Sequence, residues 1–247
     1  MTEKEEIKLT LPEIKKGIWI PKNISEDLAY LSGILVGDGH IRIRLDKHDY
    51  IIKCVGNPKD EKELYHQVIV PCIERVFGFK PIIRYQDQNT TYGFVFRSKN
   101  IVLYLTKIIG LVHGKKDQNL GIPFAIKQKP ELLIPFIRGL FDTDGCICFK
   151  KRYKLYPNYP VISLSSQSKK LIQEVSFILK SLGFKLVETY DYKRDDNRMI
   201  NGYTIINRIE MNGRTNFEKW LSTINFYSPK HLEKIKKFGK NNSGERI

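Results

Sequence analysis

The feature that most constrains this chain is an internal duplication. Residues 31–39 read LSGILVGDG and residues 137–145 read IRGLFDTDG. Each segment places bulky apolar residues between small ones and ends in Asp-Gly, at Asp38-Gly39 and Asp144-Gly145. The two aspartates are 144 − 38 = 106 residues apart, close to half of the 247-residue chain. A chain that repeats itself at such a period is expected to fold as two copies of one unit.

The segments that follow the two motifs repeat as well. In the first copy we expect strands at 40–45 and 50–55, a helix at 60–77, strands at 82–86 and 92–97, and a helix at 100–109. The counterparts in the second copy are 146–153, 161–165, 169–182, 186–192, 203–211 and 216–224. The predicted order is therefore helix, strand, strand, helix, strand, strand, helix, occurring twice.

These observations predict an α+β protein built from two pseudo-symmetric αββαββα units. We expect an N-terminal extension (residues 1–24), a first repeat (25–116), a linker (117–129), a second repeat (130–238) and a flexible basic tail (239–247). The second hairpin of the second copy is the longer one, with an Asn-Gly turn signal at 201–202.

Small residues occur four apart in both motifs, where a helix places them on one face. They are Gly33 and Gly37 in the first copy, and Gly139 and Thr143 in the second. Glycine inside a helix costs up to about 1 kcal/mol relative to alanine, so we expect compensation from close packing of the two motif helices.

Such packing would bring Asp38 and Asp144 to the same place. Paired carboxylates with nearby carbonyls are oxygen ligands suited to Mg²⁺. The alternative, for one copy alone, is that Asp-Gly only stops a helix and begins a turn. Two copies in matching contexts favour a shared site.

The charge of the chain favours a polyanionic partner. Lys and Arg total 42 against 27 Asp and Glu, giving a formal net charge of +15. DNA, RNA and an anionic membrane surface all fit this balance, and a merely soluble basic surface is the alternative. No segment approaches the roughly 20 apolar residues of a membrane-spanning helix, and the N-terminus lacks an apolar signal-peptide core. We therefore expect an intracellular protein with no membrane partner.

The four cysteines show no metal-binding spacing. Cys54, Cys72, Cys146 and Cys148 form no CxxC pair. We expect all four to be small, buried, reduced side chains.

The two motifs resemble the LAGLIDADG signature of homing endonucleases, in its single-chain, two-repeat form. The matching residues are Gly33, Asp38 and Gly39, and then Gly139, Asp142, Asp144 and Gly145. The resemblance covers residues 25–238, including the order of elements. The departures are Ser32, Val36, Gly37, Arg138 and Thr143, none of them at the terminal acidic position. The β-branched Thr143 is expected to loosen the helix contact slightly.

The resemblance implies two four-stranded antiparallel saddle sheets that lie in the major groove of double-stranded DNA, with the motif helices forming the interface between units. It implies a monomeric, metal-dependent endonuclease that makes a staggered double-strand break. Asp38 and Asp144 would bind divalent cations such as Mg²⁺, helped by the backbone carbonyls of Gly37 and Thr143. Because the two copies differ, the target is expected to be long and weakly palindromic.

The resemblance also implies supporting catalytic residues. Asn57 and Gln167, at the ends of the second strands, would order active-site water. Lys115 or Lys116, and Lys230, would approach the same centre. For each lysine the alternative is a solvated surface charge.

Alternation along the strands indicates which polar side chains face away from the helices. As a group they are expected to line the DNA groove, although each alone could be ordinary solvent-facing polarity. They are His40, Arg42, Arg44, Arg84, Gln86, Gln88, Arg97, Lys150, Arg152, Lys154, Arg194, Arg208 and Glu210.

Two other functions compete with DNA cleavage. A protein of this family could act on intron RNA as a maturase, or bind DNA as a regulator without cutting it. Loss of the acidic pair would favour either alternative, whereas here both aspartates are present. A basic RNA-binding protein of a purely structural kind would not account for the paired motifs.

Overall fold

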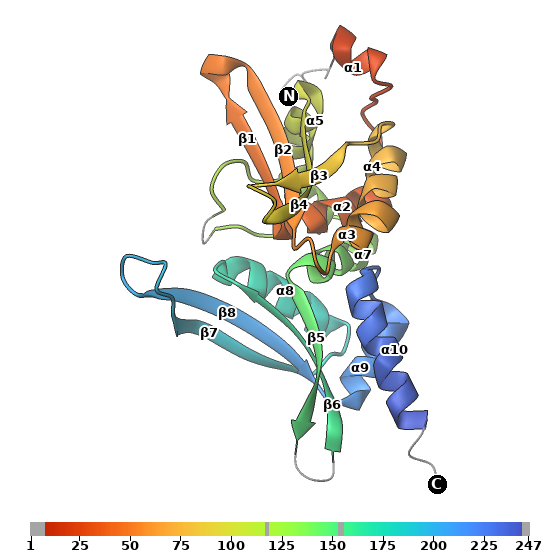
Figure 1. Cartoon of the computed structure of the whole chain (residues 1–247), viewed down its shortest axis with the longest axis vertical. Helices are drawn as coiled ribbons and strands as arrows, with labels where there is room; N and C mark the ends of the chain where they lie inside the picture. Colours follow the sequence, from red (N-terminus) through yellow and green to blue (C-terminus); the bar gives the residue numbers. More distant parts are fainter. Residues whose placement is uncertain (1–7, 117–118, 153–155, 244–247) are drawn as a thin grey trace.

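The computed structural model describes residues 8–116, 119–152 and 156–243. Two halves follow one another along the long axis of the molecule, with helices α2 (Glu26–Gly37) and α7 (Pro130–Thr143) between them (Figure 1). No helix in these ranges is both long and apolar enough to cross a membrane.

The first half begins with α2, whose N-cap Ser25 accepts a hydrogen bond from the Leu28 N–H at 3.2 Å. Strands β1 (Gly39–Arg44) and β2 (Asp49–Gly56) follow, joined by the 3₁₀ turn η1 (Leu45–Lys47). After a helical segment come β3 (Ile83–Gln86) and β4 (Thr91–Arg97), and then α5 (Lys99–Leu103) with η3 (Tyr104–Ile109). The strands form an antiparallel sheet in the order β1-β2-β4-β3.

The second half repeats this plan. After α7 come β5 (Gly145–Arg152), β6 (Tyr156–Ser166), α8 (Lys169–Ser181), β7 (Leu186–Asp195), β8 (Tyr203–Asn212) and α9 (Arg214–Thr223). These strands form a second antiparallel sheet in the equivalent order β5-β6-β8-β7. The predicted α+β fold with two αββαββα units is confirmed.

The helix predicted at 60–77 is not regular. It consists of α3 (Lys62–Leu64), the π-helical turn η2 (Tyr65–Ile69) and α4 (Val70–Phe77). Pro71 lies in the first turn of α4 and has no N–H to close a bond onto the preceding turn, which accounts for the wider winding ahead of it.

Three helices were not predicted, and they correct the expected boundaries. Helix α1 (Leu11–Lys15) lies in the N-terminal extension, and α6 (Phe124–Lys127) lies in the segment expected to be an irregular linker. Helix α10 (Pro229–Ser243) continues past residue 238 into the segment expected to be a flexible tail. The many Lys residues of this segment obscure its amphipathic pattern in the sequence.

The N-terminal extension is docked on the first half through one buried carboxylate. Glu13 accepts hydrogen bonds from the Ser98 hydroxyl at 2.5 Å and from the Asn100 N–H at 3.1 Å. Burial opposes ionisation of Glu13, but hydrogen bonds from Ser98, from Thr10 and from the Asn100 side chain outweigh that effect and lower its pKa to about 2. Ser98 itself caps α5 by accepting from the Ile101 N–H at 3.1 Å, and Glu13 adds a second acceptor at the start of this helix.

The two motif helices pack backbone against backbone, as the small residues predicted. A Cβ added to Gly33 would lie 2.1 Å from the carbonyl oxygen of Phe136, and one added to Gly139 would lie 2.1 Å from that of Tyr30. Only glycine permits this approach, and the glycines therefore fix the distance between the two halves.

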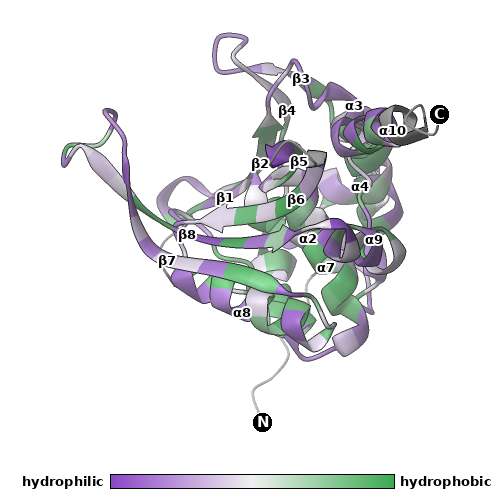
Figure 2. Cartoon of the chain, turned by 90° about the horizontal axis from the view of Figure 1, so that it is seen from below, coloured by the Kyte–Doolittle hydropathy of each residue, from purple (hydrophilic) through white to green (hydrophobic). Residues whose placement is uncertain are grey.

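The hydrophobic core extends through both halves by way of this helix pair. Phe136, Ile137 and Leu140 of α7 are fully buried, as are Leu28 and Ile34 of α2. Figure 2 shows hydrophobic residues concentrated on α2, α7 and the strands near them. The motif helices are thus part of one continuous core.

The cysteine prediction is half right. All four cysteines are free, and Cys54 and Cys72 are buried, whereas Cys146 is exposed and Cys148 is half-buried. The difference arises because β5 alternates, and both Cys146 and Cys148 lie on the face of the strand opposite the buried Ile147.

Candidate active site and nucleic-acid interface

The two motif aspartates occupy equivalent positions at the ends of the paired helices. Asp38 is the C-cap of α2 and Asp144 is the C-cap of α7. Their N–H groups donate to the carbonyls of Ile34 at 2.9 Å and Leu140 at 3.0 Å. A Cβ added to Gly37 would lie 3.4 Å from the carboxyl carbon of Asp144, so the second carboxylate lies against the end of the first helix.

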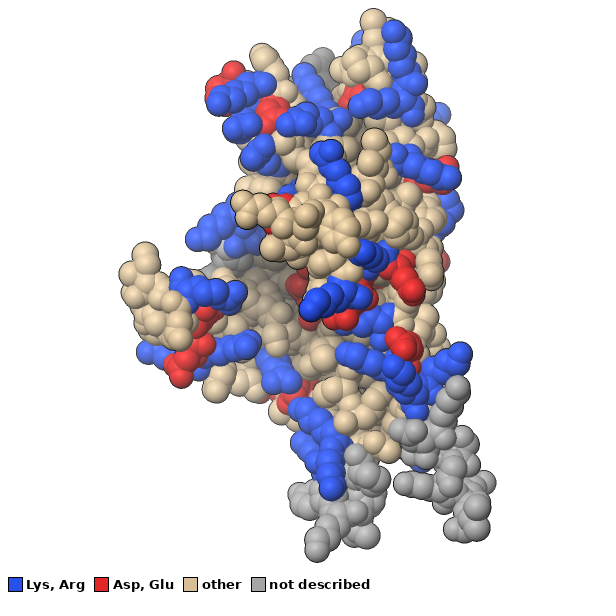
Figure 3. Space-filling model, viewed as in Figure 1, with Lys and Arg blue, Asp and Glu red and all other residues tan. Residues whose placement is uncertain are grey.

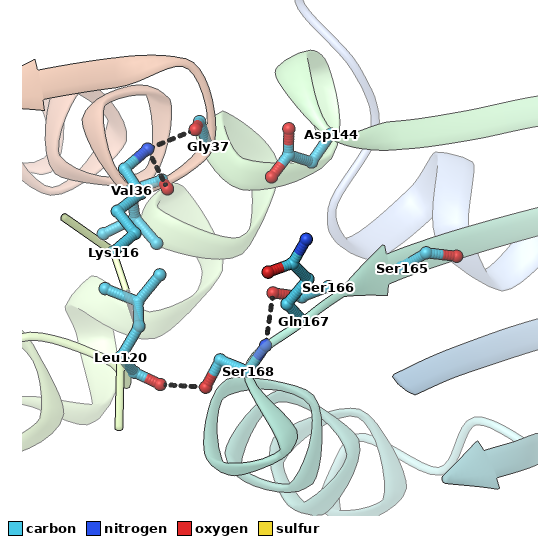
Figure 4. A pocket seen from close by; sticks show the side chains of 9 residues that line it. All are labelled: Val36, Gly37, Lys116, Leu120, Asp144, Ser165, Ser166, Gln167 and Ser168. Carbon is cyan, nitrogen blue, oxygen red and sulfur yellow. Dashed lines mark hydrogen bonds between the residues drawn. The ribbon is translucent and has the colours of Figure 1, made fainter. Parts of the chain in front are cut away.

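A hollow of about 290 Å³ opens where the two halves meet at this point. Gly37 and Lys116 from the first half line it, together with Asp144 and Gln167 from the second. Figure 4 shows the Asp144 carboxylate and the Gln167 amide on facing sides of the hollow, both pointing into it. The predicted residues Asp144, Gly37, Lys116 and Gln167 therefore share one site.

Lys116 and not Lys115 reaches this hollow. The Gly114 N–H donates to the carbonyl of Ile41 at 2.7 Å, which ties the segment after η3 to strand β1. The Lys116 ammonium then donates to the carbonyls of Val36, at 2.7 Å, and of Gly37. Burial lowers the pKa of Lys116, and the nearby Asp144 opposes that shift. Lys115 is exposed.

The environment raises the pKa values of both Asp38 and Asp144. Burial, followed by the charges of Asp144 and Glu61, raises the pKa of Asp38 to about 7. Burial also raises the pKa of Asp144 to about 6, with Glu61 adding to the rise and Lys116 opposing it. Asp144 is exposed and Asp38 is half-buried, so water is withdrawn from Asp144 less completely than from Asp38. Like charges held together in this way favour a bound cation.

The hard oxygen donors at this centre suit a divalent metal ion. Asp38 and Asp144 supply carboxylate oxygens, and the helix ends supply carbonyls such as that of Gly37. Within the described residues, no group of three or more His, Cys, Asp and Glu side chains is placed to hold a metal. An ion here would therefore need oxygens from water or from a ligand in addition to those of the chain. The residues present fit such an ion.

Glu61 is a third carboxylate at the centre, and no pattern in the sequence selects it. It is 7% exposed and accepts hydrogen bonds from the Asn57 N–H at 2.7 Å and from the Lys230 ammonium at 2.9 Å. Asn57 and Lys230 are thereby brought together although 173 residues of sequence separate them (230 − 57 = 173). Nothing in the spacing of Glu61 within its own segment marks it out.

Asp142, which matches the family signature, has a different task from Asp144. Its carboxylate accepts hydrogen bonds from the Tyr30 hydroxyl at 2.7 Å and from the N–H groups of Tyr227 and Ser228 at 3.0–3.2 Å. It thus joins α2 of the first half to the start of α10, the helix that carries Lys230. Burial raises the pKa of Asp142 to about 6, against the effect of these donors.

Three of the predicted DNA-contacting arginines converge on one acidic residue in the first half. The guanidinium groups of Arg42, Arg44 and Arg97 lie 3.2, 2.7 and 3.0 Å from the carboxylate of Asp49. The Asp49 side chain is 9% exposed, whereas those of the three arginines are 43, 42 and 71% exposed. Hydrogen bonding by Arg44 is the main cause of a lowered pKa of Asp49. We call these four residues the arginine cluster.

The remaining predicted contacts of the first half lie on the strands and the turn between β3 and β4. His40, Arg84 and Gln88 are exposed, and Gln86 is half-buried. Among the charged side chains on the face shown in Figure 3, lysine and arginine predominate over aspartate and glutamate, and the outline is indented between the two projecting hairpins.

The second half has a smaller counterpart of the arginine cluster. Arg208 and Lys150 lie 2.6 and 3.7 Å from the same carboxylate oxygen of Glu210. Glu210 therefore holds these two basic side chains in place, and its predicted contact with DNA stays a prediction. Arg152 and Arg194 are exposed on β5 and β7, and Lys154 lies outside the described residues.

Comparison with known proteins identifies the repeated unit. Residues 131–225 match the family model of the LAGLIDADG-like domain. A structure of I-DmoI in complex with DNA and Ca superposes with a TM-score of 0.56 at 19% identity, covering 87% of this chain and all of the other. A structure of I-LtrWI, a LAGLIDADG homing endonuclease bound to target DNA, superposes with a TM-score of 0.53 at 12% identity. The superposition covers 90% of this chain and 92% of the other.

Several curated relatives contain a similar segment within longer chains. An uncharacterized protein of Methanocaldococcus jannaschii is 27% identical over 77% of this chain and 66% of its own length. The glutamine–fructose-6-phosphate aminotransferase of that organism is 23% identical over 87% of this chain and 18% of its own. The NrdEB alpha subunit of ribonucleoside-diphosphate reductase from Bacillus subtilis is 25% identical over 71% of this chain and 16% of its own length. This chain thus spans less than a fifth of the two named enzymes.

The domain match in the second half, the duplicated motif and the two-sheet fold all agree. Residues 131–225 thus form a LAGLIDADG-like domain, and the chain as a whole has the two-repeat fold of the homing endonucleases I-DmoI and I-LtrWI.

Proposed function

We propose that this chain is a site-specific DNA endonuclease that makes a staggered double-strand break by metal-dependent hydrolysis. One observation carries the proposal: carboxylates from equivalent ends of two copies meet at a single centre, and their mutual repulsion helps to raise the pKa of Asp38 to about 7. A protein that only bound DNA would have no use for this arrangement, because the unneutralised carboxylates repel a phosphate.

Basic groups on both sides of the centre support the same proposal. Lys116 and Lys230 lie near the carboxylates and would stabilise the negative charge that develops on a phosphate under attack. Gln167, pointing into the hollow, would orient a water molecule. A bound Mg²⁺ or similar cation would supply activation of that water and neutralisation of the phosphate. Asp38 and Asp144 would hold it.

The sheets would supply the recognition. The exposed strand residues of both halves, with the arginine cluster at their centre in the first half, form a basic surface suited to a duplex. Solved relatives of this fold were crystallised in complex with DNA and Mn, and with target DNA and Mg. Because one chain contributes both carboxylates, a monomer would suffice, and its unequal sheets would read a long, weakly palindromic site.

The test is selection of cleaved duplexes from a randomised DNA library with Mg²⁺, with and without a chelator. We expect one enriched sequence with a cut in each strand, in the Mg²⁺ arm alone. Recovery of a bound but uncut sequence would instead support a DNA-binding regulator. Binding of intron RNA with no DNA cleavage would support a maturase.

Substitution of either aspartate adds the mechanistic test. Asp38→Asn and Asp144→Asn should each abolish double-strand cutting of the selected duplex and leave its binding largely intact. Asp46→Asn, which makes the same change on the exposed η1 turn, is the control. Full double-strand cutting by either motif variant would refute the assignment.

A further inference from the structure

We propose that Glu61 is a positioning residue that holds Lys230 beside Asp38 and thereby makes the two halves of the active site chemically unequal. This inference rests on the proposed function. We call Asp38, Asn57, Glu61 and Lys230 the first half-site, and Asp144, Lys116 and Gln167 the second half-site.

The side chain of Glu61 is not explained by ordinary helix capping. Glu61 immediately precedes α3, yet its carboxylate makes no cap hydrogen bond to that helix. Ser168 immediately precedes α8 in the second half and does cap it, accepting from the Leu171 N–H at 3.1 Å. The carboxylate of Glu61 instead turns back to the Asn57 N–H and outward to Lys230.

The surroundings of Glu61 are shaped to admit its carboxylate. A Cβ added to Gly56 would lie 2.0 Å from Oε2 of Glu61, so any larger residue there would displace it. The side chain is 10% exposed, and that of its partner Lys230 is 26% exposed. A charge pair this enclosed holds its lysine in one place, unlike a surface pair between mobile side chains.

The pair also lies where it can act on the reaction. Both Glu61 and Lys230 contribute to the electrostatic environment of Asp38, and Glu61 contributes to that of Asp144. Lys230 belongs to α10 of the second half, and that helix packs against α3 of the first. Glu61 therefore brings the Lys230 ammonium of the second half to the Asp38 carboxylate of the first half.

Among the residues that the structure describes, the second half-site has no such pair. Its lysine, Lys116, is held by the backbone carbonyls of Val36 and Gly37, which carry no net charge. One lysine is thus fixed by a carboxylate and the other by dipoles. We infer that the two DNA strands depend differently on Glu61, because each half-site serves one strand.

The experiment follows each strand separately, on the selected duplex labelled with a different dye on each strand. Asp38→Asn first identifies the DNA strand that the first half-site cuts, because cleavage of that strand should be slowed more than cleavage of the other. Glu61→Gln should slow that strand by roughly 10- to 100-fold, the range for removal of a residue that orients an active-site group, and leave the other within about threefold. Nicked duplex should accumulate.

A matched control is available in the second half. Glu174 also accepts one backbone N–H, from Ile122 at 2.8 Å, and one lysine ammonium, from Lys127 at 2.7 Å. Glu174→Gln removes an equivalent pair that lies away from both half-sites, and it should leave the ratio of the two strand rates unchanged.

Two further variants separate positioning from structural support. Lys230→Met should slow the same strand, and combining it with Glu61→Gln should add little, because both remove one pair. The charge-swapped variant with Glu61→Lys and Lys230→Glu should recover thermal stability without recovering the rate. Equal slowing of both strands by Glu61→Gln, or recovery of the rate by the swap, would overturn the proposal. If the unmodified chain cuts neither strand, the proposed function fails and this inference fails with it.

Discussion

Asp49 fixes the orientation of three arginine side chains through ion pairs. Its nearly buried carboxylate fixes the guanidinium groups of Arg42, Arg44 and Arg97 while their outer edges stay exposed. Arginines held in advance lose less conformational freedom when they contact base edges, so the arginine cluster should favour specific over nonspecific binding.

Asp49→Asn is therefore expected to reduce discrimination between sequences. Affinity for nonspecific DNA should rise, because one negative charge is lost from the basic surface, while affinity for the selected site should not rise equally. Competition binding at fixed salt measures the ratio. The control is Asp27→Asn, which removes the same charge from the ion pair between Asp27 on α2 and Arg75 on α4. An unchanged ratio in Asp49→Asn would show that the cluster does not serve specificity.

The raised pKa values at the centre predict how stability depends on pH without metal. The pKa of Asp38 is about 7 and that of Asp144 about 6 in the folded chain, against 3.8 for an ordinary aspartate. The folded chain then binds more protons than the unfolded chain between about pH 4 and pH 7, so the free energy of unfolding falls as pH rises through that window.

Asp38→Asn should remove most of this loss. Its Tm in chelator should exceed that of the unmodified chain increasingly from about pH 4 to pH 7 and level off above, as the linkage requires. The pKa values of Glu13 and Asp49 are lowered, so the stability that these carboxylates contribute is lost only when the pH falls below the ordinary pKa of a carboxyl group. This loss should be the same in Asp38→Asn and in the unmodified chain. A difference in Tm that is constant with pH would contradict the electrostatic account.

At the scale of elements, the α2–α7 contact determines whether the two carboxylates can meet. Gly33→Ala would place a methyl group against the backbone of Phe136 and force the helices apart. We expect a loss of about 1–3 kcal/mol in the free energy of unfolding, as for other overpacked sites, and a larger relative loss of cutting than of DNA binding. Denaturant unfolding and cleavage rates measure the two effects.

Gly239→Ala provides the comparison for that substitution, since an added Cβ there has open space within α10. Its stability should stay the same or rise slightly, because alanine favours helix more than glycine does. If Gly33→Ala behaved in the same way, the helices would not be as closely packed as their backbone distances indicate.

The elements that sequence predicted well are those with a partner copy. Comparison of the two halves predicted α2, α7 and the strands, because each segment has a counterpart in the other copy, although β6 begins at Tyr156, five residues before its predicted start at Val161. Helices α1, α6 and α10 have no such repeat, and they were missed. Strand β7 extends three residues beyond its predicted end at Tyr192, to Asp195, because its pairing with β8 continues past an irregularity near Asp191.

At the scale of the whole molecule, charge should dominate binding. With a formal net charge of +15, the chain should lose roughly 10³- to 10⁵-fold in DNA affinity between about 50 and 200 mM salt, as proteins with several phosphate contacts do. Arg84→Ala, on exposed β3, should reduce the salt slope by about 1. Lys80→Ala, which removes a charge paired with Glu74 on α4, should leave the slope unchanged. A flat salt response would rule out phosphate contacts as the main source of affinity.

The parts of the site that sequence could not predict depend on contacts between the halves. Asp38 and Asp144 were found because the motif repeats. Glu61 was missed because its partner Lys230 lies 169 residues away, a pairing that no local pattern encodes. The choice between Lys115 and Lys116 depended likewise on one backbone bond, from Gly114 to Ile41.

The bonds that join the halves determine how the halves would pair if they were separated. Tyr30 finds its acceptor, Asp142, only in the other half, where the first motif has Val36. Lys230 likewise finds Glu61 only across the junction, where the second half has Ser168. Neither half carries both members of either bond, so a dimer of one half with itself would lack both. Expressed as separate polypeptides, the halves should therefore pair with each other in preference to copies of themselves.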